Sequence, residues 1–316
     1  MPSKQQSQAS RGAILVFATE RYGYLQREMC REMGLVPGEV ERRRFPDGER
    51  YQRIRTDVTG RDVALVGGTV SDEDTLEIFD LANGLVRYGA HTLTLVIPYL
   101  GYSTMDRAVH QGEVVTAKAR ARLLSALPTA GSGNRIMLLD LHTEGLQHYF
   151  DGNLRPVHLH ARTQVVEVAR NIGGANFVLA CADAGRAKWV ETLANELGVV
   201  ASFVFKRRIT GRQTEVTAVS AQVEGRQVVI YDDMIRTGGT LLGAAKAFLD
   251  SGATQVSAIA THGVFPGDSL ERLRKSGLLA RIVVTDSHPR AVELRSPYLT
   301  VVSCAELLAT ALTRAD

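Results

Sequence analysis

Short apolar runs alternate along the chain with longer segments in which apolar residues recur every three or four positions. Runs rich in Val, Ile and Leu predict buried strands, and the longer segments predict amphipathic helices. The predicted strands are 13–18, 63–68, 91–99, 135–140, 177–182, 202–208, 228–231, 256–262 and 281–286. The predicted helices are 21–33, 74–88, one ending at 127, 162–171, 188–197, 241–249 and 305–315. Strands that alternate with helices predict an α/β fold with mostly parallel central sheets flanked by helices.

Two segments depart from this alternation. Residues 41–53 contain Phe-Pro-Asp-Gly, which is typical of a hairpin turn, and residues 212–219 are expected to pair back on the strand at 202–208. The length of 316 residues allows two domains. We expect a first domain over 12–158, with a C-terminal helix at 303–316 packing back on it, and a second over 159–302. The polar residues 1–11 predict a disordered tail.

Composition narrows the class of protein. Hydrophobic residues make up 45% and charged residues 22%, as in ordinary soluble α/β proteins, and the net charge of +3 is too small to indicate nucleic-acid binding. No apolar run approaches the length of a membrane span. Three widely spaced cysteines indicate neither disulfides nor a zinc motif. We therefore expect a cytoplasmic protein that binds neither membranes nor nucleic acid.

The most specific chemistry lies between the strand at 228–231 and the helix at 241–249. Two adjacent acids are expected at the end of the strand, followed by a turn rich in Gly and Thr. These residues are Asp232, Asp233, Arg236, Thr237, Gly238, Gly239 and Thr240. A Gly-rich turn at a helix N-terminus presents N–H groups to a phosphate, and paired carboxylates accept hydrogen bonds from neighbouring sugar hydroxyls. No Lys follows the second Gly, so this is no Walker A loop. The turn predicts a site for a ribose 5-phosphate unit.

This turn resembles the phosphoribosyl diphosphate (PRPP) loop of the type I phosphoribosyltransferase fold. From about residue 13 to its end the chain also resembles ribose-phosphate pyrophosphokinases, or PRPP synthetases. The matching segments follow the family's order: FPDGER, IPYLGYSTMDR, DLHTEGLQHYF, ADAGRAK, FVFKRR, IYDDMIRTGGT, THGVF and VSCAELLATAL. The resemblance implies two tandem phosphoribosyltransferase-like domains and a homo-oligomer built from dimers, up to a hexamer. It also implies transfer of a diphosphate from Mg-ATP to ribose 5-phosphate.

The resemblance assigns roles to individual residues. Lys206 and Arg208 match the family's catalytic hairpin, and their spacing on a strand places both on one face, where two cations could stabilise developing charge. Without the resemblance, they would also fit an ordinary basic edge strand. His142 and Asp183 match the residues that hold Mg²⁺. The pair His158 and His160 resembles half a metal site but has no third ligand nearby in sequence, so we interpret it as structural.

A second group of residues matches the family's nucleotide site: Phe45, Asp47, Glu49, Asp106 and Arg107. Phe45 could stack on adenine, and an acid could accept from its exocyclic amine. Taken without the family, the segment around Phe45 would be interpreted as a simple hairpin turn.

Three departures from the family pattern lie close to the predicted chemistry. Thr104 and Met105 replace an Arg-Gln pair, Arg236 replaces an Asp, and Arg186 replaces a second Gly of the pyrophosphate turn. Thr104 cannot make the phosphate contacts of the Arg that it replaces. Arg236 and Arg186 instead add positive charge near the predicted ribose and pyrophosphate sites.

Three functions therefore remain open at this point. The leading hypothesis is a PRPP synthetase, with ATP or another nucleotide as its second substrate. The alternatives are a non-catalytic homologue that regulates or assembles with active synthetases, and a phosphoribosyltransferase that consumes PRPP.

Overall fold

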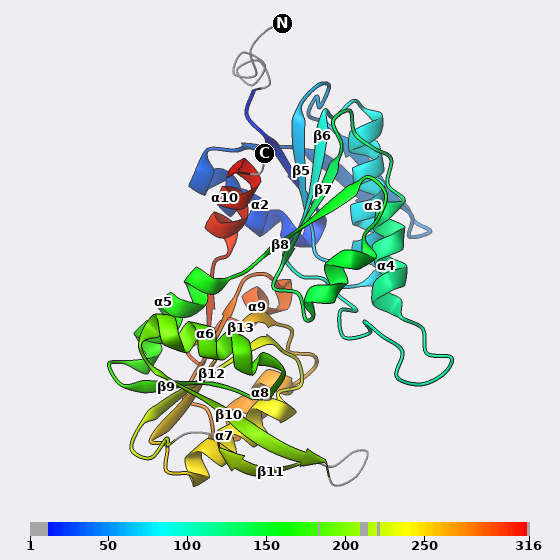
Figure 1. Ribbon diagram of the computed structural model, residues 1–316. Helices are drawn as coiled ribbons and strands as arrows, with labels where there is room; N and C mark the ends of the chain where they lie inside the picture. The colour runs from blue at the N-terminus through cyan, green and yellow to red at the C-terminus, as the bar shows by residue number, and fades with distance from the viewer. Residues whose placement is uncertain (1–11, 183, 209–213, 220–221, 315–316) are drawn as a thin grey trace, which may run out of the picture. The chain divides into compact units, whose positions relative to one another are not determined.

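The computed structural model describes residues 12–182, 184–208, 214–219 and 222–314, and these form two compact units (Figure 1). Unit 1 comprises Met1–His160 together with Ala305–Asp316, and unit 2 comprises Ala161–Cys304. Each unit is a mostly parallel sheet flanked by helices, so the predicted fold class is confirmed. The expected tail at 1–11 lies outside the described residues.

Unit 1 contains a six-stranded sheet with the order β2-β1-β5-β6-β7-β8, and every pairing in it is parallel. Its strands are β1 (Leu15–Ala18), β2 (Val36–Pro37), β5 (Asp62–Val66), β6 (Thr92–Ile97), β7 (Asn134–Leu139) and β8 (Leu154–Leu159). Its helices are α2 (Gly23–Met33), α3 (Asp72–Arg87), α4 (Thr116–Ser125) and α10 (Ala305–Arg314). Helix α10 packs against α2, so the C-terminal segment belongs to this unit. An antiparallel hairpin forms from β3 (Val40–Arg44) and β4 (Arg50–Ile54).

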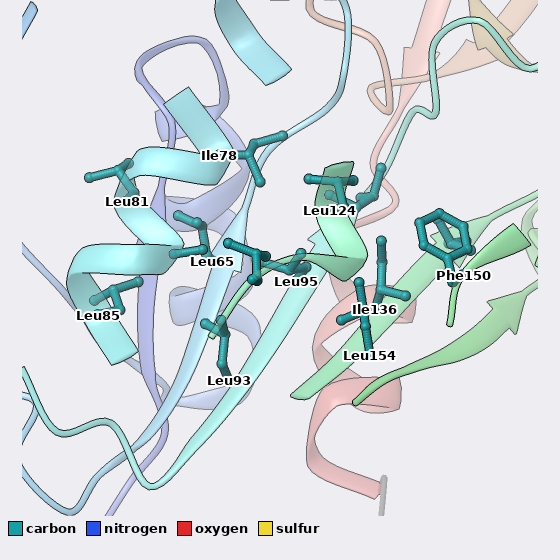
Figure 2. Close-up of a cluster of buried hydrophobic side chains, with 14 of the residues drawn as sticks. Leu65, Ile78, Leu81, Leu85, Leu93, Leu95, Leu124, Ile136, Phe150 and Leu154 are labelled. Carbon is teal, nitrogen blue, oxygen red and sulfur yellow. The ribbon is translucent and has the colours of Figure 1, made fainter. Parts of the chain in front are cut away.

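Helix α3 shows how a predicted amphipathic helix begins and how its apolar face packs on the sheet of unit 1. Ser71 caps α3 by accepting a hydrogen bond from the Asp74 N–H at 3.2 Å, and three acids occupy the first turn, where the helix dipole favours negative charge. Ile78, Leu81 and Leu85 then face the side chains of β5 and β6 (Figure 2). Leu76, on another face of α3, is 51% exposed, so not every apolar residue of this helix enters the core.

Unit 2 contains a seven-stranded sheet with the order β11-β10-β9-β12-β13-β14-β15, which is parallel except for the β10–β11 hairpin. Its strands are β9 (Phe177–Cys181), β10 (Val200–Arg208), β11 (Thr214–Val219), β12 (Gln227–Ile235), β13 (Gln255–Gly263), β14 (Ile282–Thr285) and β15 (Leu299–Val302). Its helices are α5 (Arg162–Gly173), α6 (Ala187–Leu197), α7 (Gly239–Asp250), α8 (Ser269–Lys275) and α9 (Pro289–Glu293). A second apolar core lies between this sheet and its helices.

The sequence-based assignment was incomplete in three respects. It contained neither of the short helices α8 and α9. It contained no strand at 36–37, 154–159 or 299–302, because these short segments lack a clear apolar alternation. It also ended the central strand of unit 2 at Tyr231, whereas β12 continues to Ile235, so Asp232 and Asp233 belong to the strand. Among the described residues, no helix is both long and apolar enough to cross a membrane.

Candidate functional site

The two acids of the predicted ribose-phosphate loop differ in their surroundings. Asp232 and Asp233 lie near the carboxyl end of β12, the end at which open α/β sheets bind ligands. Since neighbouring strand residues point to opposite faces, the two carboxylates cannot be equivalent. Asp232 is half-buried and accepts a hydrogen bond from the Asp233 N–H at 2.9 Å. Asp233 is only 2% exposed, so its carboxylate requires a charged or hydrogen-bonding partner.

The turn after β12 leads directly into helix α7. Arg236, Thr237, Gly239 and Thr240 are exposed there, whereas Gly238 is buried. Gly238 is the N-cap of α7 and has a left-handed backbone with φ of +78°. A Cβ at this position would lie 2.6 Å from Cδ2 of Leu273. Conformation and close packing therefore both favour glycine, and the turn presents the helix N-terminus without a capping side chain.

Arg186 forms an ion pair with the buried acid. Its guanidinium lies 3.1 Å from Oδ2 of Asp233, and the two side chains are 22% and 3% exposed. Burial by itself would lower the pKa of Arg186, but the negative charge of Asp233, supported by Tyr231 and Asp232, outweighs burial and raises the pKa. Arg186 therefore remains charged and links the segment after β9 to β12.

In unit 1 the structure brings Asp106 next to the segment that carries His142. Thr143, the neighbour of His142, donates a hydrogen bond through Oγ1 to Oδ2 of Asp106 at 3.1 Å. The hydroxyl of Tyr149 donates to the backbone carbonyl of Asp106. Arg107 is exposed and His142 is half-buried. The loop after β6 and the segment after β7 are thus tied together at the carboxyl edge of the sheet.

The hairpin β3–β4 presents the other nucleotide-site candidates at its turn. Phe45 is 44% exposed and makes an edge contact with Tyr51, with ring centroids 6.1 Å apart. Asp47 accepts a hydrogen bond from the Glu49 N–H at 3.1 Å, so this acid also stabilises the turn. Both acids are exposed. The structure therefore leaves an exposed aromatic ring and two acids at the tip of this hairpin.

A buried acid on α3 anchors the hairpin. Glu77 is 1% exposed, and its Oε1 accepts from Nε of Arg42 at 3.0 Å and from Nε2 of Gln52 at 3.1 Å. Arg50 contributes a second cation, 3.8 Å from Oε2. One carboxylate thus joins both strands of the hairpin to the helix.

We expect Glu77→Gln to lower the free energy of unfolding of unit 1 by about 1–3 kcal/mol, because a neutral amide cannot serve these donors as well as a carboxylate. Hydrogen exchange should also become faster in residues 40–54. Glu73→Gln is the matched control, because the Glu73 side chain is 69% exposed and its ion pair with Arg44 is a surface one. Equal unfolding free energies in the two variants would contradict the anchoring role.

Three predicted site residues cannot be placed at the level of side chains. Asp183 and the side chains of Lys206 and Arg208 lie outside the described part of the structure. The backbone of β10 is described, and it pairs with β9 only over Val200–Phe203. Lys206 and Arg208 therefore lie on the part of β10 that pairs with β11 alone.

Sequence reasoning missed two contacts that matter for these sites. The first is the ion pair between Arg186 and Asp233, which are far apart in the chain. The second is the contact of Glu77 with the β3–β4 hairpin, because only the apolar residues of its helix were considered. The sequence signal for Glu77 was its place between apolar positions of an amphipathic helix, where a buried acid needs a partner.

Known proteins match the chain over nearly its whole length. A model of the N-terminal domain of ribose phosphate pyrophosphokinase matches residues 14–127, and a model of the phosphoribosyl synthetase-associated domain matches residues 194–316. The ribose-phosphate pyrophosphokinase of Synechococcus elongatus is 33% identical, with 95% of this chain and 90% of the relative covered. That of Rhodopirellula baltica is 34% identical, with 95% of each covered. The crystal structure of phosphoribosylpyrophosphate synthetase from Mycobacterium smegmatis aligns with a TM-score of 0.82 at 28% identity, covering 96% of this chain and 98% of the other.

Two α/β units, one of which carries a Gly- and Thr-rich turn behind paired acids, define a protein of the type I phosphoribosyltransferase fold. The matches extend through both units and are not confined to that turn. The chain belongs to the ribose-phosphate pyrophosphokinase family, as its motifs predicted.

Proposed function

We propose that the chain is a ribose-phosphate diphosphokinase, which transfers the β,γ-diphosphate of Mg-ATP to the 1-hydroxyl of ribose 5-phosphate. The observation that carries the proposal is identity of 33–34% to ribose-phosphate pyrophosphokinases over about 95% of the chain. The oxygen of the attacking hydroxyl forms a bond to the β-phosphorus and the hydroxyl proton is released to solvent, while the bond from that phosphorus to the oxygen bridging it to the α-phosphorus breaks. The products are PRPP and AMP, which keeps the bridging oxygen.

The residues of unit 2 would position ribose 5-phosphate. The N–H groups at the start of α7, with Thr237 and Thr240, would bind the 5-phosphate, and Arg236 would add a cation. Asp232 and Asp233 would accept hydrogen bonds from the ribose hydroxyls. Holding the acceptor in line with the β-phosphorus is most of what this reaction requires of a protein.

The remaining proposed residues act on the nucleotide and on charge. Residues of the β3–β4 hairpin would receive the base, and Asp106 and Arg107 would contact the nucleotide. Lys206 and Arg208 would stabilise the charge that develops on the transferred group. The proposed nucleotide-binding residues are Phe45, Asp47, Glu49, Asp106 and Arg107.

We propose that His142 and Asp183 are each a ligand for a divalent cation, Mg²⁺. The surroundings of His142 fit such an ion, since Thr143 holds the Asp106 carboxylate beside this segment, and Mg²⁺ combines few protein ligands with substrate phosphates. When bound, Mg²⁺ would neutralise phosphate charge and polarise the transferred group. We further propose that the protein is cytoplasmic, which agrees with three free cysteines, of which Cys181 and Cys304 are buried. We propose a homo-oligomer from the family resemblance alone.

The test is incubation of the purified protein with Mg²⁺, ribose 5-phosphate and a panel of nucleoside triphosphates, followed by phosphorus NMR. We expect PRPP and a matching nucleoside monophosphate, with the preferred nucleotide showing what Thr104 and Met105 change. Chelation of Mg²⁺ should abolish turnover. If no nucleotide is turned over by protein that still binds ribose 5-phosphate, a non-catalytic partner of active synthetases becomes the better interpretation.

We expect Arg186→Met to raise the KM for ribose 5-phosphate about tenfold with a smaller change in kcat, because the buried Asp233 carboxylate would lose the cation that holds it in place. Steady-state kinetics in both substrates measures this. Arg162→Met is the matched control, since it removes an ion pair with Glu196 in the same unit whose side chains are 51% and 39% exposed. A lower KM in Arg186→Met would instead mean that Arg186 obstructs the ribose site.

A further inference from the structure

Three potential metal ligands meet at the carboxyl edge of the unit 1 sheet. Asp140 directly follows β7, His158 lies in β8 and His160 directly follows β8. These strands are parallel neighbours with Leu139 opposite Leu159, so the strand pairing brings Asp140 to the two histidines. One ligand atom from each residue lies within 4.8 Å of those of the other two. The interpretation of His158 and His160 as structural lacked this third group.

The spacing of one pair of ligand atoms in the cluster suits a small divalent cation. Nδ1 of His160 lies 3.3 Å from Oδ1 of Asp140, and the two imidazole centroids are 4.2 Å apart. Tetrahedral Zn²⁺ with bonds of about 2.0–2.1 Å places neighbouring ligand atoms about 3.3 Å apart. Two imidazoles and one carboxylate favour Zn²⁺, Co²⁺ or Ni²⁺ over Mg²⁺, which prefers oxygen ligands.

Burial of the cluster is uneven in a way that favours ion entry. The Asp140 side chain is 4% exposed, so its negative charge gains from a nearby cation, whereas the His160 side chain is 45% exposed. An ion can therefore reach the carboxylate past His160. Three protein ligands would leave a position for water, as in open zinc sites.

Binding at this cluster would change a hydrogen bond next to His142. The Leu141 N–H donates to Nε2 of His158 at 3.0 Å. A metal bound at Nε2 would take the lone pair that accepts this bond, and a metal bound at Nδ1 would shift the imidazole proton to Nε2. In either case the hydrogen bond from the Leu141 N–H to His158 is lost. The backbone there is already unusual, because Asp140 has φ of +38°.

We propose that Asp140, His158 and His160 form a binding site for a divalent cation of the Zn²⁺ type, and that its occupation breaks the hydrogen bond between the Leu141 N–H and His158. The ion would thereby displace the segment that carries His142 and inhibit the enzyme. The binding site stands independently of the proposed function, and the inhibition rests on it.

The first experiment measures Zn²⁺ binding by equilibrium dialysis of the full-length protein in excess Mg²⁺. We expect about one Zn²⁺ per chain, and His160→Ala should weaken binding at least about tenfold, since even loss of an outer-shell partner costs that much. Asp140→Asn, which keeps the shape of the side chain, should weaken it as well. His110→Ala is the control, because His110 is exposed and belongs to the same unit. No binding to the wild type, or equal binding to His160→Ala, would overturn the site.

The second experiment adds Zn²⁺ to the PRPP assay at saturating Mg²⁺ and substrates. The wild type should be inhibited at Zn²⁺ concentrations at least about tenfold lower than His160→Ala requires. If Zn²⁺ binds but does not inhibit an active wild type, the link to Leu141 is wrong. If the protein makes no PRPP even without Zn²⁺, the proposed function fails, and the dialysis result still decides whether the site exists.

Discussion

Lys206→Ala is expected to lower kcat for PRPP formation about 10²–10³-fold, the usual cost of removing one preorganised donor from a developing charge. Ribose 5-phosphate should still bind, because the residues that we propose for it belong to β12 and its connection to α7, whereas Lys206 belongs to β10. Steady-state kinetics and calorimetric titration with ribose 5-phosphate measure the two effects separately.

The backbone of β10 supports this expectation. The β9–β10 pairing ends at Phe203, and the β10–β11 register shifts between Phe205 and Lys206. A shift of this kind bends a strand and re-aims its side chains, and such irregularities are common next to active sites. Lys206 thus follows an irregularity on a two-stranded extension of the sheet.

Arg207→Ala is the matched control for Lys206→Ala. It removes the same charge from the same strand. Because successive strand residues alternate between faces, Arg207 is expected on the face opposite to that of Lys206 and Arg208. We expect its kcat to stay within about threefold of the wild type, which corresponds to less than 1 kcal/mol. Undiminished turnover in Lys206→Ala would refute the catalytic assignment, and equal losses in both variants would indicate a general effect of charge on the hairpin.

Gly238→Ala is expected to lower the free energy of unfolding of unit 2 by about 2–4 kcal/mol. A left-handed backbone costs a residue with a Cβ about 1–2 kcal/mol, and forcing that atom against Leu273 adds about 1–2 kcal/mol, within the usual cost of overpacking. Because the turn also forms the proposed phosphate site, the KM for ribose 5-phosphate should rise at least about tenfold. Urea denaturation followed by the fluorescence of Trp189, the only Trp of the chain, reports on unit 2, since Trp189 stacks on Tyr231 of β12 at 4.2 Å.

Gly243→Ala provides the comparison within the same helix. A Cβ on Gly243 meets nothing within 4 Å, and its backbone is helical. Alanine should therefore stabilise α7 by about 0.5–1 kcal/mol through helix propensity, with no change in KM. The signs of the two effects on stability should be opposite. If Gly238→Ala were as stable as Gly243→Ala, the close packing against Leu273 would not matter energetically.

The ion pair between Arg186 and Asp233 changes the meaning of one departure from the family pattern. In the sequence, an Arg in the pyrophosphate turn could crowd the backbone or supply a cation to a substrate. The structure directs its guanidinium to a buried acid of the neighbouring strand. The additional charge is therefore compensated inside unit 2, which is compatible with a working ribose site.

The sequence by itself determined the family, the α/β class and most of the elements, because these depend on local features. Periodic apolar positions predict α3 and β6. The Gly and Thr residues of the 237–240 turn indicate the start of helix α7 without reference to the rest of the fold. The short edge strand β8 was missed because its polar and apolar residues do not alternate clearly.

Only the tertiary structure decided which polar residues meet. Glu77 with Arg42, Arg186 with Asp233, and Asp140 with His160 are pairs separated by 20 or more residues. Each is created by strand pairing or by packing of a helix on a sheet, and no local propensity encodes the partner. Burial then gives these contacts their energy, because a charge removed from water must find its partner within the fold.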